Sequence, residues 1–488
     1  MAALAWLAAH RALLVGLLGV AMSAVTTLHV LVVPRQPRSA AGWLAVIWLS
    51  PIVGPVIYVL LGINRIARKG RRLRTEARPE REAGEVGDGG DGLAAPVVDA
   101  PALAAAPHLA ALRAATDRLV DRPLLGGNAI APLVDGDAAF PAMLEAIAGA
   151  RRSIALATYI FDGDQVGRRF VDALAAARAR GVEVRVLIDA AGVRYHRPPA
   201  HKLLRAAGVP CALFLPMRRA FPRYWNLRNH RKVMVVDGEV AFTGGINLRV
   251  HHWFALTPAE PTHDLHFRVT GPVVAQLQEV FADDWAFTTG ETLAGATWFA
   301  APTDGGAVHA RALPEGPDDE SDPVPWTILT ALGVARRRVC VVSPYFLPDP
   351  PLVAALDVAA LRGVQVDVVI PARTNFRFVD AAVRGGLWQL RDHGVRIWMS
   401  PPPFDHTKLM TVDGAWALLG SSNWDPRSMR LNFELDLEAY DPDLVAALDA
   451  LVDARIARAR RFTRADLDGR RWPRRILDGA ASVAQPYL

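Results

Sequence analysis

Cysteine is scarce in this sequence, and the common metal-binding patterns are missing from it. The 488 residues include two cysteines, Cys211 and Cys340, and both lie in apolar runs. That setting predicts buried core thiols rather than a disulfide or a metal site. No CxxC, no HExxH and no carboxylate cluster with metal-ligand spacing occurs. We therefore expect no metal ion and no cofactor, and the cysteine content fits a catalytic domain in the cytoplasm.

A strong excess of one charge is also missing. The formal net charge is +6 and the isoelectric point is about 9.6. This modest excess suits an anionic partner, either nucleic acid or the anionic face of a bilayer. Because no basic stripe interleaved with aromatic residues is present, nucleic acid is not expected. An anionic membrane is the expected partner, and no pattern in the sequence specifies an oligomeric state.

Two apolar runs stand near the N-terminus. The first, 12–33, contains no charged residue and is long enough to cross a bilayer as a helix, at roughly 1.5 Å per residue. The second, 40–63, contains Pro51, Gly54 and Pro55, so it is either a kinked span or a re-entrant hairpin. Proline at membrane depth needs local rescue of backbone hydrogen bonds. A cleaved signal peptide is the alternative for the first run, but the second run would remain as an anchor.

Basic residues predict how this membrane anchor, residues 1–75, is oriented. Arginine and lysine cluster at positions 65–74, after the second run, and are sparse between the two runs. The positive-inside rule then places the C-terminal domain in the cytoplasm. We predict a multi-pass protein of the inner cell membrane with a catalytic domain that faces the cytoplasm.

The rest of the chain is predicted to be a linker followed by a duplication. Residues 76–120 are rich in Ala, Pro, Gly, Asp and Glu and are expected to be a linker. A strand, a helix that ends in Gly and a second strand are expected over 150–189, and the same order recurs over 335–370. Such βαβ units predict an α/β fold with a parallel or mixed sheet covered by helices. We place the two halves at 121–300 and 301–488.

One polar motif occurs twice. Both copies contain, at equal spacing, a histidine, a lysine, an aspartate, a pair of small residues and an asparagine: His230, Lys232, Asp237, Gly244, Gly245 and Asn247, then His406, Lys408, Asp413, Gly420, Ser421 and Asn423. A single H-x-K would mean little, but two equally spaced copies imply an active site assembled from two related halves. The alternative is a pair of structural hairpins in which His and Lys are satisfied internally.

Each copy is predicted to fold as a β-hairpin with Asp-Gly at its turn. His and Lys are two positions apart, so on a strand they point to one face. Asp237 and Asp413 lie at the predicted turns, an odd number of residues from the histidines. On this pattern they are interpreted as turn-forming or supporting groups rather than groups that touch substrate. The small pair before each asparagine allows close approach of the backbone.

Two His, two Lys and two Asn suit chemistry on a phosphodiester. Ammonium groups and amides neutralise and orient the phosphate oxygens. One imidazole can attack phosphorus and form a covalent intermediate. The other can protonate the leaving alkoxide and then deprotonate the incoming alcohol or water, a contribution of about 10²–10⁴-fold.

The two H-x-K-x4-D-x6-G-[GS]-x-N copies resemble the phospholipase D superfamily. A wider set of segments resembles bacterial cardiolipin synthases: 43–64, 127–128, 135–137, 159–162, 226–232, 420–428 and 432–434. The similarity covers nearly the whole chain except the linker and the C-terminal end. It implies two tandem phospholipase D-type α-β-α halves that form one pseudo-twofold catalytic unit, preceded by an α-helical membrane segment.

The resemblance also implies a reaction and roles. The reaction is phosphatidyl transfer between two phosphatidylglycerol molecules, which gives cardiolipin and glycerol through a phosphohistidine. His230 would be the nucleophile and His406 the acid and base. The motif residues counted as catalytic are His230, Lys232, Asp237, His406, Lys408 and Asp413. Lys232, Lys408, Asn247 and Asn423 would hold phosphate, and Asp264 and Glu434 would each orient the imidazole of the opposite half.

The chain departs from the family pattern after Asn247. Residues 248–252 read Leu-Arg-Val-His-His where small and acidic residues are usual, and 262–266 loosen the family pattern around Asp264. The acceptor side of the substrate site is therefore the part most open to change. The histidines of this region, His251, His252, His263 and His266, are expected on the surface or along the substrate rather than around a metal.

Other functions compete with phosphatidyl transfer. A phospholipase D that hydrolyses phospholipids to phosphatidic acid would use the same site with water as acceptor. A nuclease of the same superfamily and a non-enzymatic membrane scaffold are the remaining alternatives. At the C-terminus, Arg470, Arg471, Trp472, Arg474 and Arg475 suit either a membrane surface or a solvated tail.

Overall fold

The computed structural model describes residues 2–33, 37–62, 104, 106–216, 227–317, 322–390 and 393–483. The backbone divides into two compact units. The first, termed the helical unit, comprises residues 1–69 and 217–226, and the second, termed the sheet unit, comprises residues 70–216 and 227–488. Each is described by itself.

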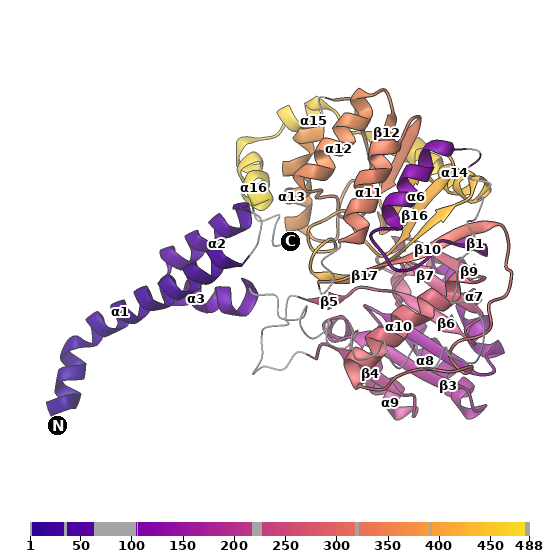
Figure 1. Cartoon of the computed structure of the whole chain (residues 1–488), viewed down its shortest axis with the longest axis horizontal. Coiled ribbons are helices and arrows are strands. Elements are labelled where there is room, and N and C mark those ends of the chain that lie inside the picture. The colour runs from indigo at the N-terminus through magenta and orange to yellow at the C-terminus, as the bar shows by residue number, and fades with distance from the viewer. Residues whose placement is uncertain are drawn as a thin grey trace. The chain divides into compact units, whose positions relative to one another are not determined.

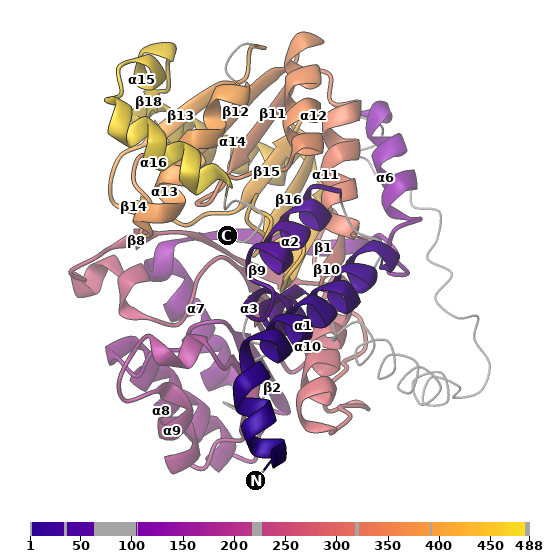
Figure 2. The same ribbon diagram turned by 90° about the vertical axis from the view of Figure 1, so that its left-hand side faces the viewer.

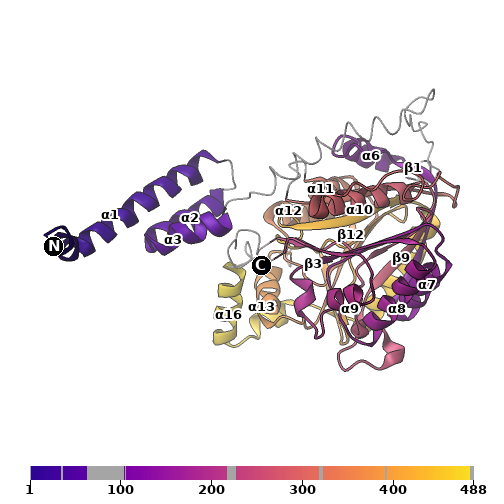
Figure 3. The ribbon, with the colours of Figure 1, turned by 90° about the horizontal axis from the view of Figure 1, so that it is seen from below.

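The helical unit is built from the two apolar runs. Its elements are α1 (Ala2–Val32), α2 (Pro37–Leu49), α3 (Val53–Ile57) and a π-helical turn, η1 (Tyr58–Gly62). Figures 1 and 3 show α2 and α3 side by side with α1, and both helices contact it. Among the described residues, one helical stretch, His10–Val32, is long and apolar enough to cross a membrane. The second run is not one continuous helix, because it breaks between Leu49 and Val53.

A serine of α1 forms hydrogen bonds with the broken segment that contains α2 and α3. Pro51 and Pro55 lack an N–H, so the carbonyl groups four residues before them, those of Ile47 and Pro51, lose their usual helical donors. The Ser23 hydroxyl lies 3.4 Å from Ile47 O and 3.2 Å from Pro51 O. A side chain of the neighbouring helix therefore supplies the hydrogen-bond donor that these carbonyl groups lack, as expected for proline in this run.

The sheet unit is organised around one large mixed sheet. Among the described residues this sheet has 16 strands, in the order β18-β13-β12-β11-β15-β16-β17-β10-β1-β9-β7-β6-β2-β3-β4, with β5 paired to β17. The strands are β1 (Leu125–Val134), β2 (Ser153–Thr158), β3 (Glu183–Asp189), β4 (Cys211–Phe214), β5 (Arg228–Asn229), β6 (Val233–Val236), β7 (Val240–Gly244), β9 (Leu265–Thr270), β10 (Val308–Glu315), β11 (Arg338–Val342), β12 (Gln365–Pro371), β13 (Arg396–Ser400), β15 (Leu409–Val412), β16 (Trp416–Gly420), β17 (Asn432–Tyr440) and β18 (Arg460–Arg461). A small second sheet pairs β8 (Thr262–His263) with β14 (Phe404–Asp405).

Helices cover both faces of the large sheet. Figure 3 shows α10, α11 and α12 along one side and α7, α8 and α9 along the other. The helices of this unit are α6 (Ala110–Thr116), α7 (Asp135–Gly149), α8 (Gln165–Ala179), α9 (Ala200–Ala206), α10 (Val273–Thr289), α11 (Pro323–Val334), α12 (Pro350–Leu361), α13 (Arg377–Gly386), α14 (Pro442–Arg458), α15 (Arg464–Asp468) and α16 (Trp472–Val483). Aspartates cap the N-termini of several helices. For example, the Asp164 side chain accepts a hydrogen bond from Gly167 N, and the Asp441 side chain accepts one from Leu444 N.

The predicted duplication is confirmed by the strand pairing. β2, β3 and β4 run parallel in the first half, and β11, β12 and β13 run parallel in the second. The motif hairpins β6–β7 and β15–β16 pack antiparallel beside β2 and β11. β2 is buried along its whole length, as expected of a central strand covered on both faces. Figure 2 shows the two halves, one above the other.

Each half has its own apolar core. One cluster gathers residues between 139 and 248, and another gathers residues between 106 and 124 together with residues from 313 onward. The two cysteines are free; Cys340 is buried on β11, and Cys211 is half-buried at the start of β4.

Residues 106–120 correct the predicted linker. A 3₁₀ turn, η2 (Pro107–Leu109), and α6 pack on α11, and Leu109 and Leu112 belong to the core of the second half. His108 also pairs with Asp413 at 2.6 Å. The alanine-rich composition predicts a linker, whereas the three-residue spacing of these leucines is a helical signal. Most of residues 76–105 lies outside the described residues.

The two halves exchange short strands at their junction. β5, just before the first motif histidine, pairs parallel with the start of β17 in the second half. β14, just before the second motif histidine, pairs parallel with β8 in the first half. Each motif therefore begins beside the acidic residue of the opposite half, since Glu434 lies on β17 and Asp264 directly follows β8.

Candidate active site

The two motif histidines face each other at this junction. The backbone N–H of His230 donates to the backbone carbonyl of Phe433 at 2.8 Å, and the backbone N–H of His406 donates to that of His263 at 2.7 Å. The ring centroids of His230 and His406 lie 6.5 Å apart with an interplanar angle of 79°. Reacting atoms stand about 3–3.5 Å apart in a near-attack geometry, so a phosphorus atom fits between the two rings.

Each imidazole has a carboxylate from the other half on its Nδ1. Glu434 Oε2 lies 2.9 Å from His230 Nδ1, and Asp264 Oδ2 lies 2.8 Å from His406 Nδ1. All four side chains are buried. A carboxylate on Nδ1 holds the proton there and leaves Nε2 as the reactive nitrogen.

The two carboxylates differ in their surroundings. Glu434 accepts hydrogen bonds from Ser421, Ser428 and Asn432 in addition to the His230 contact. Burial opposes ionisation of Glu434, but the contact with His230, the charge of Lys232 and the hydrogen bond from Ser421 outweigh it and lower its pKa to about 2. Asp264 accepts from its own neighbour, Leu265 N, at 2.8 Å, and burial raises its pKa to about 6. Asp264, the carboxylate that contacts His406, therefore holds a proton more readily than Glu434 does.

Both lysines lie beside their histidines, and no carboxylate of the described residues is in direct contact with either ammonium group. Lys232 Nζ donates to His230 O at 2.6 Å, and Lys408 Nζ donates to His406 O and lies 2.7 Å from His406 Nδ1. Burial lowers the pKa of Lys232 to about 7 and that of Lys408 to about 8. A bound phosphate anion would favour the charged form of both ammonium groups.

Burial also keeps the imidazoles neutral. It lowers the pKa of His230 to about 4, although the Glu434 carboxylate opposes that shift. The pKa of His406 lies well below its usual value, because burial is reinforced by the charges of Lys408 and Lys232. His230 is therefore neutral and paired with the ionised Glu434 carboxylate.

The small pair in each motif makes room for these carboxylates. A Cβ on Gly245 would collide with the Asp264 carboxylate. At the equivalent position the Ser421 hydroxyl donates to Glu434 Oε2 at 2.6 Å. The asparagines that follow, Asn247 and Asn423, both line the cleft, and Asn247 Oδ1 accepts from Ile160 N at 3.1 Å.

Asp237 and Asp413 lie at the hairpin turns and outside this cleft. Both have positive φ, 56° and 54°. The Asp237 carboxylate accepts from the backbone N–H groups of residues 151–153, and the Asp413 carboxylate accepts from those of residues 336–338. This geometry corrects their grouping with the catalytic residues and favours the turn-forming interpretation.

A cleft of about 360 Å³ opens over the two histidines. Residues of both halves line it: Tyr159, Ile160, Tyr195, Arg228, His230, Asn247, Arg249, His252, Thr262, Tyr345, Leu347, Asn375, Phe376, Val379, Phe404, His406, Asn423, Asp425, Arg427 and Asn432. Tyr159 packs edge-on against His230 at 5.0 Å and Tyr345 against His406 at 6.3 Å. Both tyrosines follow equivalent strands of the repeat, and this equivalence is the sequence pattern that points to them.

The divergent loop contributes one histidine to the cleft. His252 is buried, lines the cleft, and lies 6.3 Å from His406 between ring centroids. Of the other three, His251 contacts Glu260 O, His263 contacts Asp135, and His266 is buried beside Gly244. These four histidines thus contact different groups, and His252 is the one that lines the cleft.

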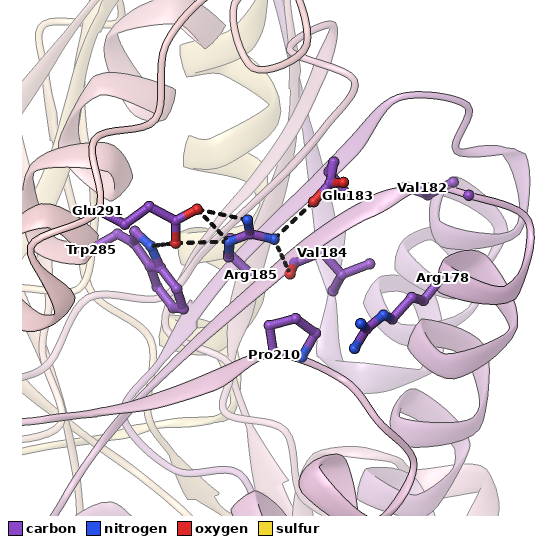
Figure 4. Close-up of a pocket in the computed structure, with 9 residues that line it drawn as sticks. Arg178, Val182, Glu183, Val184, Arg185, Pro210, Trp285 and Glu291 are labelled. Carbon is purple, nitrogen blue, oxygen red and sulfur yellow. Dashed lines mark hydrogen bonds and ion pairs between the residues drawn. The ribbon is translucent and has the colours of Figure 1, made fainter.

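A second hollow, of about 400 Å³, lies at the start of β3 (Figure 4). Arg185 bonds Glu183 and Glu291 there, and Trp285 Nε1 donates to Glu291 at 2.7 Å. The motif histidines lie instead near the opposite end of the neighbouring strand, β2. Because Arg185, Glu183 and Glu291 already pair with one another, we assign this hollow no ligand.

Comparison with known proteins identifies the family. Residues 143–285 and 328–456 match the family described as "Cardiolipin synthase, PLD-like domain", and residues 21–62 match "Phospholipase_D-nuclease N-terminal". The chain belongs to the cardiolipin synthase family. It is 34% identical to a cardiolipin synthase A of Pseudomonas putida (strain W619), over 93% of this chain and 92% of that protein. It is 36% identical to cardiolipin synthase A of Pseudomonas aeruginosa (strain LESB58), over 75% of this chain and 74% of that protein.

A solved structure shares the fold of the sheet unit. The phosphatidylserine synthase of Haemophilus influenzae Rd KW20 superposes with a TM-score of 0.58 at 16% identity, covering 77% of this chain and 100% of that one. The cardiolipin synthase family and this fold make the protein a membrane-associated enzyme of the phospholipase D superfamily that acts on phospholipid.

Proposed function

We propose that this protein joins two phosphatidylglycerol molecules into cardiolipin and releases glycerol. The single observation that carries the proposal is the facing pair His230 and His406, each backed by a carboxylate of the opposite half. The relatives named cardiolipin synthase A match this chain over most of their length. Hydrolysis to phosphatidic acid is the less favoured outcome of the same site.

In the first step His230 Nε2 attacks the phosphorus of one phosphatidylglycerol. A P–N bond forms, the P–O bond to glycerol breaks, and His406 supplies a proton to the glycerol oxygen. Lys232, Lys408 and the two asparagine amides stabilise the charge on the phosphate oxygens. The phosphodiester anion between the rings raises the pKa of His406, so that the Asp264–His406 pair can carry the proton.

In the second step a hydroxyl group of another phosphatidylglycerol attacks the phosphohistidine. His406 takes the hydroxyl proton, the P–N bond breaks, and the new P–O bond completes cardiolipin. Water at this stage would give phosphatidic acid instead. Apolar and aromatic groups along the cleft, such as Phe376, Val379 and Phe404, favour a lipid acceptor over water.

The membrane arrangement is also part of the proposal. α1 spans the inner membrane, α2 and α3 enter it as a broken segment, and the sheet unit faces the cytoplasm beside an anionic bilayer. The basic cluster 65–74 supports this orientation. Labelling of single cysteines placed before α1 and after α2, from either side of sealed cells, tests it.

Product analysis tests the reaction. The purified full chain in mixed micelles with phosphatidylglycerol, with and without chelator, should form cardiolipin and glycerol in equal amounts by lipid mass spectrometry. His230→Ala is the control and should form neither. Phosphatidic acid as the main product would overturn the transferase proposal, and the absence of any lipid product would overturn the substrate.

A further inference from the structure

The C-terminal helix exposes an apolar face. In α16, Trp472, Ile476 and Leu477 are 73%, 62% and 55% exposed. Their spacing places Trp472 and Ile476 one turn apart, with Leu477 beside them. Soluble surfaces seldom group large apolar side chains in this way without a binding role.

The opposite face of α16 is fixed to the protein. Asp478 and Ala481 are buried, and Ala481 belongs to the apolar core of the second half. α16 packs on α13, where a Cβ on Gly385 would meet Asp478 O at 2.5 Å. Arg470 pairs with Asp478 at the start of the helix. α16 is therefore a docked helix with a fixed outer face rather than a solvated tail.

The neighbouring helix α13 continues the exposed apolar surface. Phe376 and Phe378 at its start and Trp388 in the 3₁₀ turn η7 (Leu387–Leu390) are all exposed. Figures 1 and 2 show α13 and α16 side by side. Two packed helices thus present aromatic and aliphatic groups outward.

Positive charge surrounds these apolar groups. Arg471, Arg474 and Arg475 are exposed beside Trp472, and Arg373 and Arg377 are exposed beside Phe376. Segments 471–477 and 373–378 contain no acidic residue. Apolar anchors flanked by arginine are typical of helices that lie in the interface of an anionic bilayer.

The surface is continuous with the cleft. Phe376 and Val379 line the cleft, and Phe376 stands 6.3 Å from Tyr345, which itself packs against His406. A lipid whose head group reaches the histidines would pass the start of α13. The chemistry of the substrate and that of the surface therefore agree.

We propose that α13, η7 and α16 form a membrane-docking face that lies on an anionic phospholipid bilayer and admits lipid to the cleft. Docking itself is independent of the reaction, but the identity of the lipid that enters rests on the proposed function. The transmembrane helix tethers the chain, whereas this face sets how the cleft meets the bilayer surface.

Photocrosslinking of the wild-type full chain tests the docking face directly. The protein is placed in nanodiscs that contain phosphatidylglycerol with a diazirine on its acyl chain, and crosslinked peptides are identified by mass spectrometry. Crosslinks should appear in α1 and on the peptide with Trp472, Ile476 and Leu477, at about tenfold or more the yield on the peptide with Trp326 of α11. Trp326 is 54% exposed, and Figures 1 and 2 show α11 apart from α16.

Crosslinks in α1 without any on α16 would overturn the proposal. This experiment distinguishes failure of the docking proposal from failure of the proposed reaction. Crosslinking on α16 without cardiolipin formation would refute the reaction and leave the docking proposal intact.

Substitution gives a second measurement. Trp472→Glu should lower the ratio of turnover on bilayer phosphatidylglycerol to turnover on a soluble short-chain phosphatidylglycerol by about tenfold, since a charge replaces an interfacial anchor. Trp326→Glu is the matched control and should leave the ratio unchanged. An unchanged ratio in Trp472→Glu would contradict the proposal, and if that variant does not fold, the wild-type crosslinks decide.

Discussion

Glu434 holds His230 across the boundary between the two halves, with Oε2 2.9 Å from Nδ1. Asp264 makes the reciprocal contact with His406 at 2.8 Å. The two halves thus complete each other, since each supplies the carboxylate that orients the other's imidazole. The contacts differ in charge state, however, because Glu434 has its pKa lowered to about 2 and Asp264 has its pKa raised to about 6.

Replacing Glu434 tests this relationship. Glu434→Gln keeps the shape but removes the negative charge that raises the pKa of His230, so that pKa should fall below about 4. We expect kcat to fall by about 10²–10⁴-fold and the acid limb of the pH profile to move to lower pH. A loss of rate with an unmoved acid limb would contradict an electrostatic role. Circular dichroism checks that the variant is folded.

Single histidine variants test which imidazole forms the intermediate. His406→Ala should still allow His230 to attack, at a reduced rate, and should accumulate phosphoenzyme because the acid and base is missing. His230→Ala should form no phosphoenzyme. Rapid quench with radiolabelled phosphatidylglycerol, followed by tests of acid and base lability, measures this. Phosphoenzyme in His230→Ala and none in His406→Ala would reverse the roles.

The pH dependence follows from the buried groups. His230 is a nucleophile only when neutral, so kcat/KM should fall as pH falls through about 4. Lys232 must be charged to bind phosphate, so kcat/KM should also fall as pH rises through about 7. Bound phosphate raises the pKa of the lysine, so the alkaline limb of kcat should lie at higher pH than that of kcat/KM.

Lys232→Arg checks the assignment of that alkaline limb. A guanidinium stays charged throughout this range, so the limb near pH 7 should disappear and leave one set by Lys408, near pH 8. The maximal rate should fall, because arginine and lysine differ in shape. Persistence of the limb near pH 7 in this variant would assign it to another group.

The turn aspartates are expected to affect stability rather than chemistry. Asp237→Asn keeps a residue type that tolerates positive φ but weakens charge-assisted bonds to three backbone N–H groups. The loss should be about 1–3 kcal/mol in unfolding free energy, with turnover of the folded enzyme near that of the wild type. Asp413→Asn should cost more, because Asp413 also holds His108. Thermal unfolding and active-site titration separate the two effects.

Local patterns in the sequence were sufficient for the motif residues. His230 and Lys232 fall on one face because strand side chains alternate, and Asp237 falls at a turn because Asp-Gly favours positive φ. The repeat also predicted the parallel strands and the hairpins of both halves. These features depend on contacts that are close in the chain.

Features that depend on distant contacts were not predictable from local pattern. The pairing of His230 with Glu434 requires β5 to lie beside β17, and only the family resemblance suggested it. His252 reaches the cleft through a loop with no periodic pattern. Leu109 and Leu112 were assigned to a linker because the surface that buries them, α11, lies far along the sequence.

Ser23 offers a test inside the helical unit. Its hydroxyl is the side chain near the carbonyl groups that Pro51 and Pro55 leave without helical donors. Ser23→Ala removes that donor in an apolar setting, where interhelical hydrogen bonds contribute about 0.6–2 kcal/mol. Hydrogen–deuterium exchange of the full chain in nanodiscs should then be faster over residues 47–58. Thr26→Ala is the matched control, because the Thr26 hydroxyl bonds to carbonyl groups of its own helix, those of Met22 and Ser23. Equal exchange in both variants would show that α1 does not stabilise the broken segment through Ser23.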